Sequence, residues 1–72
     1  MANMKKLKLK LKEKGLSVAD VSDKMGINKA TFYRKIKNAG ETFTVGDIDK
    51  ISKILNLQVE EINEIFFASD VA

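Results

Sequence analysis

The residues best suited to recognition chemistry lie in segment 28–38, which places polar groups on one side of a helix. At about 100° per residue, Phe32 and Ile36 fall together and are expected to face the core. The outward side combines a methyl, a hydroxyl, an amide, a phenol, a guanidinium and ammonium groups, from Lys29, Ala30, Thr31, Tyr33, Arg34, Lys37 and Asn38. Such donors can bond guanine and adenine edges or phosphate in a DNA major groove.

The absence of acidic residues from segment 24–40 favours base reading over the alternative, a helix face that only keeps the protein in solution. Other chemistries find little support. The chain has no histidine and no cysteine, which removes the commonest general base and the commonest metal ligands. It also has no Gly-rich phosphate loop, and its Ser and Asp residues have capping or surface roles. We therefore expect no enzyme, metal site, cofactor or small-molecule ligand.

The charge is divided unevenly along the chain. Residues 1–38 hold eleven Lys and Arg against three acidic residues, a net charge of +8, and residues 39–72 hold two against seven, a net charge of −5. A basic half on a small domain is the electrostatic footprint of a nucleic-acid binder. Most lysines of segment 3–14 are expected to add long-range attraction rather than direct phosphate contacts.

The elements that must position segment 28–38 are also helical. Gly15, Gly26 and Gly40 divide the chain, and Ser17, Asn28, Thr44 and Gln58 are suitable N-caps. The predicted fold is all-α with five helices, at about 3–14, 17–25, 28–38 and 44–55 and from about 59 onward, and a loop at 39–43. The predicted inner faces comprise Met4, Leu7, Leu11, Val18, Val21, Ser22, Met25, Phe32, Ile36, Ile48, Ile51, Leu55, Val59, Ile62 and Phe66, with Ile65 beside the last stripe.

Seventy-two residues predict a single domain over 1–72, with no room for a separate dimerisation or ligand-binding domain. No apolar run approaches the roughly 18 residues that a membrane span needs, and no secretory signal follows the basic N-terminus. The absence of cysteine fits a reducing compartment. We expect a cytoplasmic protein of a bacterial host cell that does not bind membranes.

Residues 16–36 resemble the helix-turn-helix of the Cro/CI-like phage repressor family. A small residue, Ser22, falls where the two helices cross; Gly26 falls at the turn; Ile27 follows it; and Phe32 anchors the second helix. Lys-Glu-Lys-Gly-Leu-Ser at 12–17 and Leu-Asn-Leu-Gln at 55–58 resemble the flanking parts of the family, so the resemblance covers about residues 5–67.

The resemblance implies a five-helix lambda-repressor-like domain with its helix-turn-helix at about 17–38. It assigns base reading to Lys29, Ala30, Tyr33 and Arg34, and phosphate contacts to Ser17, Val18, Lys37 and Asn38. Two positions depart from the family pattern. Val18 stands where glutamine is common, and Lys35 stands where a second apolar anchor is usual, so that Ile36 takes that role and the helix is expected to be rotated slightly.

The implied function is sequence-specific binding of double-stranded DNA by a transcriptional regulator in a temperate-phage type of genetic switch. An alternative on the same fold is an antirepressor that binds a partner repressor and alters its DNA binding. Leu9 and Phe67 fall outside the predicted stripes and are candidates for contacts with that partner or in a homodimer. Alternatively, one or both are covered by a terminus.

Overall fold

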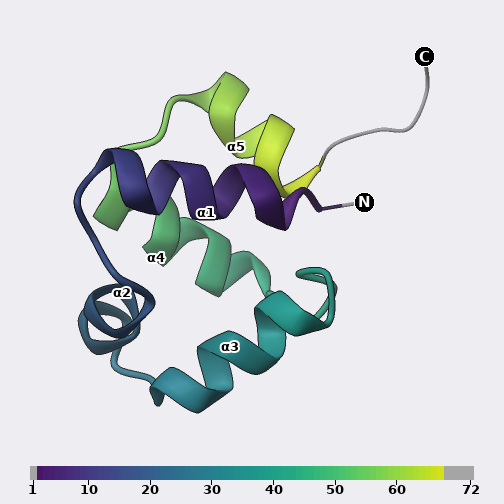
Figure 1. Ribbon diagram of the computed structural model, residues 1–72. Coiled ribbons are helices and arrows are strands. Elements are labelled where there is room, and N and C mark those ends of the chain that lie inside the picture. Colours follow the sequence, from purple (N-terminus) through teal and green to yellow (C-terminus); the bar gives the residue numbers. More distant parts are fainter. Residues whose placement is uncertain (1, 68–72) are drawn as a thin grey trace.

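The helix boundaries follow from polar residues that cap them. The computed structural model describes residues 2–67; Met1 and residues 68–72 of the predicted 1–72 domain lie outside this part of the chain. Within it are five helices and no strand, which confirms the all-α prediction (Figure 1): α1 Met4–Glu13, α2 Val18–Met25, α3 Lys29–Lys37, α4 Val45–Leu55 and α5 Val59–Phe66.

Three predicted caps are confirmed: the side chains of Ser17, Asn28 and Thr44 each accept a backbone N–H of the helix that follows, and Asn3, which was not predicted as a cap, does the same for α1. At the fourth predicted cap, Gln58, the side chain makes no such bond, and the Glu61 carboxylate instead accepts the N–H of Gln58. Gly26 ends α2 in the left-handed conformation, with φ 75°. None of the helices in residues 2–67 has the length and apolar character that crossing a bilayer requires.

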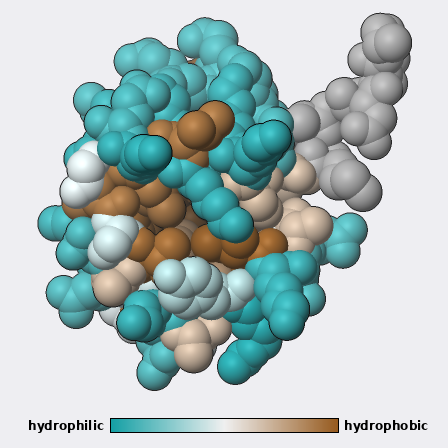
Figure 2. All heavy atoms as spheres, in the orientation of Figure 1, coloured by the Kyte–Doolittle hydropathy of each residue, from teal (hydrophilic) through white to brown (hydrophobic). Residues whose placement is uncertain are grey.

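The core lies where the five helices meet. Figure 2 shows its apolar side chains between α1 and α3, surrounded by hydrophilic residues. The buried apolar residues are Leu7, Leu11, Val21, Met25, Phe32, Ile36, Phe43, Ile51, Leu55, Ile65 and Phe66. Val18, Ile48 and Ile62, which were expected to face inward, are partly buried against this core.

The predicted inner stripe of α5 is wrong at one end. Val59 is 67% exposed, whereas Ile65 is completely buried. Phe66 lies only about 20° from Val59 around the helix and is buried, so the exposure of Val59 reflects its place as the first residue of α5 and not the side that the helix presents. On another side, α5 contacts α1, whose lysines pair with Glu61 and Glu64 and whose capping residue Asn3 donates its N–H to the Ile65 carbonyl.

The loop between α3 and α4 is packed more tightly than its sequence suggests. Phe43, which falls in the predicted loop, is a core residue. Gly40 is buried with φ 74°, and a Cβ at this position would lie 2.7 Å from Met4 Cε and 2.9 Å from Ala2 Cβ. Both the backbone angle and the available space therefore require glycine, because a side chain would strain the turn and displace the N-terminal segment.

Candidate nucleic-acid interface

The turn between α2 and α3 fixes the direction in which α3 leaves α2. The N–H of Gly26 bonds the carbonyls of Ser22 and Asp23, and the N–H of Ile27 also bonds the Ser22 carbonyl, at 3.0 Å. Ser22 is buried, and its hydroxyl donates to the Val18 carbonyl at 2.7 Å. A small, internally satisfied side chain at this position lets the two helices approach closely.

The opposite sides of α3 have opposite character. Phe32 and Ile36 are buried and attach the helix to the core, as predicted. The four predicted base readers, Lys29, Ala30, Tyr33 and Arg34, are all exposed, with Tyr33 at 52%. At 100° per residue they span an arc of about 140°. The structure therefore brings these four residues together on one outward face, as a surface available to a partner.

The electrostatics of α3 favour an anionic partner. The helix contains four basic residues and no acidic one. Among the described residues, Lys29, Arg34 and Lys37 take part in no ion pair. Lys37 and the C-cap Asn38, which were predicted to contact phosphate, are exposed beside this face. Three cations that form no ion pair within residues 2–67, together with amide and phenol groups, form a surface that matches phosphate and base edges.

The start of α2 is a less open site than α3. The Ser17 hydroxyl accepts the Asp20 N–H at 3.0 Å, and the Asp20 carboxylate accepts the Ser17 N–H at 2.9 Å. This backbone bond is the main reason that the pKa of Asp20 lies below its ordinary value. The side chain of Val18 is partly buried. A phosphate contact here would therefore use the Ser17 hydroxyl hydrogen or the Val18 N–H, close to the ionised Asp20 carboxylate.

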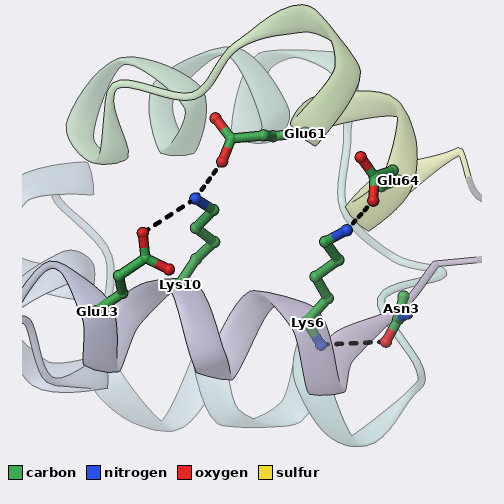
Figure 3. A network of polar contacts seen from close by, with 6 residues as sticks. All are labelled: Asn3, Lys6, Lys10, Glu13, Glu61 and Glu64. Atoms are coloured by element: carbon green, nitrogen blue, oxygen red, sulfur yellow. Dashed lines mark hydrogen bonds and ion pairs between the residues drawn. The ribbon is translucent and has the colours of Figure 1, made fainter.

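Two of the α1 lysines are directed to α5 (Figure 3). Lys6 pairs with Glu64, and Lys10 pairs with Glu61 and, at 3.3 Å, with Glu13. The hydrogen bond that the Lys10 ammonium donates to Glu61 is the main cause of the raised pKa of Lys10. The pKa of Glu61 is lowered, first by the Gln58 N–H and then by Lys10. These pairs neutralise part of the basic half, whereas Lys5, Lys8, Lys12 and Lys14 are exposed to solvent.

Lys35 is the α3 cation whose position the sequence did not reveal. Its Nζ lies 3.2 Å from the Asp47 carboxylate on α4 and donates to the Thr42 carbonyl at 3.1 Å. Burial raises the pKa of Asp47, but the N–H of Thr44 and the Lys35 ammonium outweigh it and the net pKa lies below the ordinary value. The sequence did indicate where the partner of Lys35 lies, because Thr44 and Asp47 have the spacing of a capping box, which fixes this carboxylate at the start of α4.

Apolar groups outside the core form a second exposed feature. Leu9 on α1 and Phe67 after α5 are 60% and 57% exposed, so neither is covered by the described residues, 2–67. A hollow of about 240 Å³ lies between α4 and α5, lined by Val45, Ile48, Asp49, Ser52, Ile62 and Phe67. Within the same residues there is no cluster of three or more acidic side chains that could hold a metal ion.

Comparison with known proteins gives one family. The protein-family model of the Cro/C1-type HTH DNA-binding domain matches residues 6–67, which include all five helices except the first two residues of α1. Neither the curated proteins nor the solved structures gave a match.

Proposed function

The chain belongs to the Cro/C1-type helix-turn-helix DNA-binding family, as residues 16–36 predicted, and we propose that this DNA-binding regulator acts in a temperate-phage type of genetic switch, as one domain over residues 1–72. The observation that carries the proposal is the outward face of α3, which is basic and free of acidic residues and is held by the tight turn after α2. A helix presented in this way fits a DNA major groove.

In the proposed complex α3 lies in the groove with Lys29, Ala30, Tyr33 and Arg34 toward the bases. The Arg34 guanidinium has the fork of donors that bonds guanine at two points, and the Ala30 methyl suits contact with the methyl of thymine. Lys37 and Asn38 would bond phosphate oxygens and set the register of the helix along the groove. The assignment of phosphate contacts to Ser17 and Val18 stays part of this proposal.

We also propose that the regulator binds DNA as a homodimer through the α4–α5 face. This face combines an exposed aromatic ring, Phe67, with an adjoining hollow, and an interface with two-fold symmetry needs one patch that matches itself. Two copies would place two α3 helices on half-sites about 34–36 Å apart on one side of the duplex. Phe67→Asp should then give a monomer by sedimentation, and Leu9→Asp, which changes α1, should not.

Selection of bound duplexes from a random pool, at two salt concentrations and with the purified protein alone, tests the DNA-binding proposal. An enriched inverted repeat with half-sites about one turn apart would support a dimeric repressor of the Cro type. Weak, salt-sensitive binding with no enriched sequence would contradict it, because backbone charge alone produces that behaviour. Arg34→Ala is the matched variant, because it removes a proposed base reader at an exposed position.

The exposed Leu9 specifically favours the second candidate function, an antirepressor that binds a partner repressor. Leu9 lies on α1, which runs across the upper half of the molecule in Figure 1, whereas α3 lies along its lower edge. A partner docked on α1 would therefore not need the α3 face. Gene neighbours would identify a repressor to test. If Leu9→Asn abolishes its binding while Arg34→Ala does not, the antirepressor function is supported; the opposite pattern would contradict a docking surface on α1.

A further inference from the structure

The two ends of α3 are held in different ways. At its start, the turn through Gly26 and Ile27 ties the helix directly to α2. At its end, α3 is followed by the loop of residues 38–44, and Gly40 donates its N–H to the Lys35 carbonyl at 2.9 Å. Phe32 and Ile36 bury one side of the helix in the core, and a directional polar contact near this second end would restrict the angle of the helix further.

Lys35 provides such a polar contact. Among the described residues, its side chain makes the only side-chain hydrogen bond and the only ion pair between α3 and a later part of the chain. The Nζ contacts the Thr42 carbonyl and the Asp47 carboxylate and lies 5.8 Å from the centroid of the Phe43 ring. The side chains of Lys35 and Asp47 are 20% and 18% exposed, so water screens this pair less than a pair on the open surface.

The partner of Lys35 is itself fixed. The Asp47 Oδ2 atom that faces Lys35 also accepts the Thr44 N–H at 3.0 Å, and the Thr44 hydroxyl accepts the Asp47 N–H at 3.0 Å. This capping box holds the carboxylate at the first turn of α4. Lys35 therefore bonds a rigid acceptor and not a mobile surface carboxylate.

We propose that Lys35 is a positioning residue that sets the angle of α3 by bonding Asp47 and Thr42, and so determines how accurately the base-reading face meets the bases. The proposal rests on the proposed function, in which α3 reads DNA. Lys35 lies about 100° around the helix from Arg34 and reaches toward α4. Its effect on DNA binding would pass through the orientation of α3, because its ammonium is occupied within the protein.

Lys37 offers a matched control on the same helix. It is exposed and takes part in no ion pair among the described residues, so Lys37→Met removes the same charge without disturbing the clamp, by which we mean the contacts of Lys35 with Asp47 and Thr42. Lys35→Met keeps the apolar stem but loses the ammonium. Lys35→Arg keeps the charge, and Asp47→Asn keeps an oxygen acceptor for the Thr44 N–H while losing the carboxylate charge.

The experiment compares binding to the selected duplex and to a scrambled duplex over a range of salt concentrations. We expect Lys35→Met and Asp47→Asn each to lower the ratio of specific to non-specific affinity by about tenfold, a loss comparable to that of one mismatched base pair. The double variant should lose little more, because both changes break one contact. Lys35→Arg should stay close to wild type. Lys37→Met should weaken both duplexes alike and make the salt slope shallower by about one.

Amide hydrogen exchange without DNA provides a second readout. Exchange of residues 34–38 should be faster in Lys35→Met and in Asp47→Asn than in Lys37→Met. If Lys35→Met behaves like Lys37→Met in salt slope, ratio and exchange, Lys35 is a phosphate contact and the proposal is overturned. An unchanged ratio in a folded Asp47→Asn protein also overturns it. If wild type enriches no duplex at all while exchange changes as expected, the failure belongs to the proposed function and not to the clamp.

Discussion

Phe43 lies edge-on to Phe32, with ring centroids 5.7 Å apart and ring planes inclined by 61°. Phe43 is equally close to Phe66, at 5.8 Å and 84°. A residue of the α3–α4 loop therefore joins the underside of α3 to α5, on the far side of the molecule. Edge-to-face aromatic pairs stabilise beyond the burial of their area, so the base-reading helix rests on a continuous aromatic contact through the core.

Phe32→Ala is expected to destabilise the protein by about 3–5 kcal/mol, because it removes a completely buried ring and leaves a cavity next to Phe43. Chemical denaturation followed by circular dichroism measures the change. Tyr33→Ala is the matched control, since this aromatic ring on the same helix is 52% exposed, and it should change stability far less. An unaltered Phe32→Ala curve would mean that α3 does not pack on the core through this face.

Arg34→Ala should cost roughly 1–3 kcal/mol of specific binding and relax the preference at one base position, because it removes a bidentate donor from the proposed base-reading face. Repeating the duplex selection with this variant gives the preference directly. A motif identical to that of wild type would show that Arg34 reads no base.

Lys37→Ala should weaken binding about equally for all sequences and make the salt slope shallower by about one unit. A lysine bonded to phosphate releases counterions and carries no sequence information. Titrations of two unrelated duplexes at several salt concentrations measure both effects. A changed preference at a single base would instead place Lys37 among the base readers.

Stability should fall on acidification. The pKa values of Asp20, Asp47 and Glu61 lie below their ordinary values of 3.8, 3.8 and 4.5. A carboxylate with a lowered folded-state pKa contributes stability that is complete above its unfolded-state pKa and is lost as the pH falls through the folded-state value. The melting temperature should therefore fall progressively below about pH 4.5.

A pair of neighbouring variants tests the origin of this loss. Glu61→Gln removes one contributing carboxylate and should reduce the acid-dependent part of the change in melting temperature. Glu60→Gln is the control, because the exposed Glu60 makes no side-chain hydrogen bond or ion pair among the described residues. Equal pH profiles for the two variants would contradict the role assigned to Glu61.

The helix boundaries could be predicted because capping is a local property. Ser17 with Asp20, for example, specifies the start of α2 within a few residues of sequence, and Gly26 specifies its end. The outward face of α3 was predictable for a similar reason, since its orientation follows from Phe32 and Ile36 on the same helix. The resemblance to the repressor family over residues 16–36 used these same local features.

What could not be predicted depends on partners distant in sequence. The exposure of Val59 depends on where the core ends along α5, and the burial of Phe43 follows from rings on two other elements. Lys35 was recognised as a departure from the family pattern, but its bond to Asp47 joins two helices across a loop. Helical periodicity carries no information about such contacts.

Tyr33 gives the candidate interface a spectroscopic property. The chain contains one tyrosine and no tryptophan, so nearly all emission excited near 280 nm comes from this single ring on the outward face of α3. A nucleobase stacked on the phenol, or a phosphate bonded to its hydroxyl, would quench that emission. The unlabelled protein therefore reports optically on occupation of its own α3 face, and titration with short duplexes can be followed by intrinsic fluorescence alone.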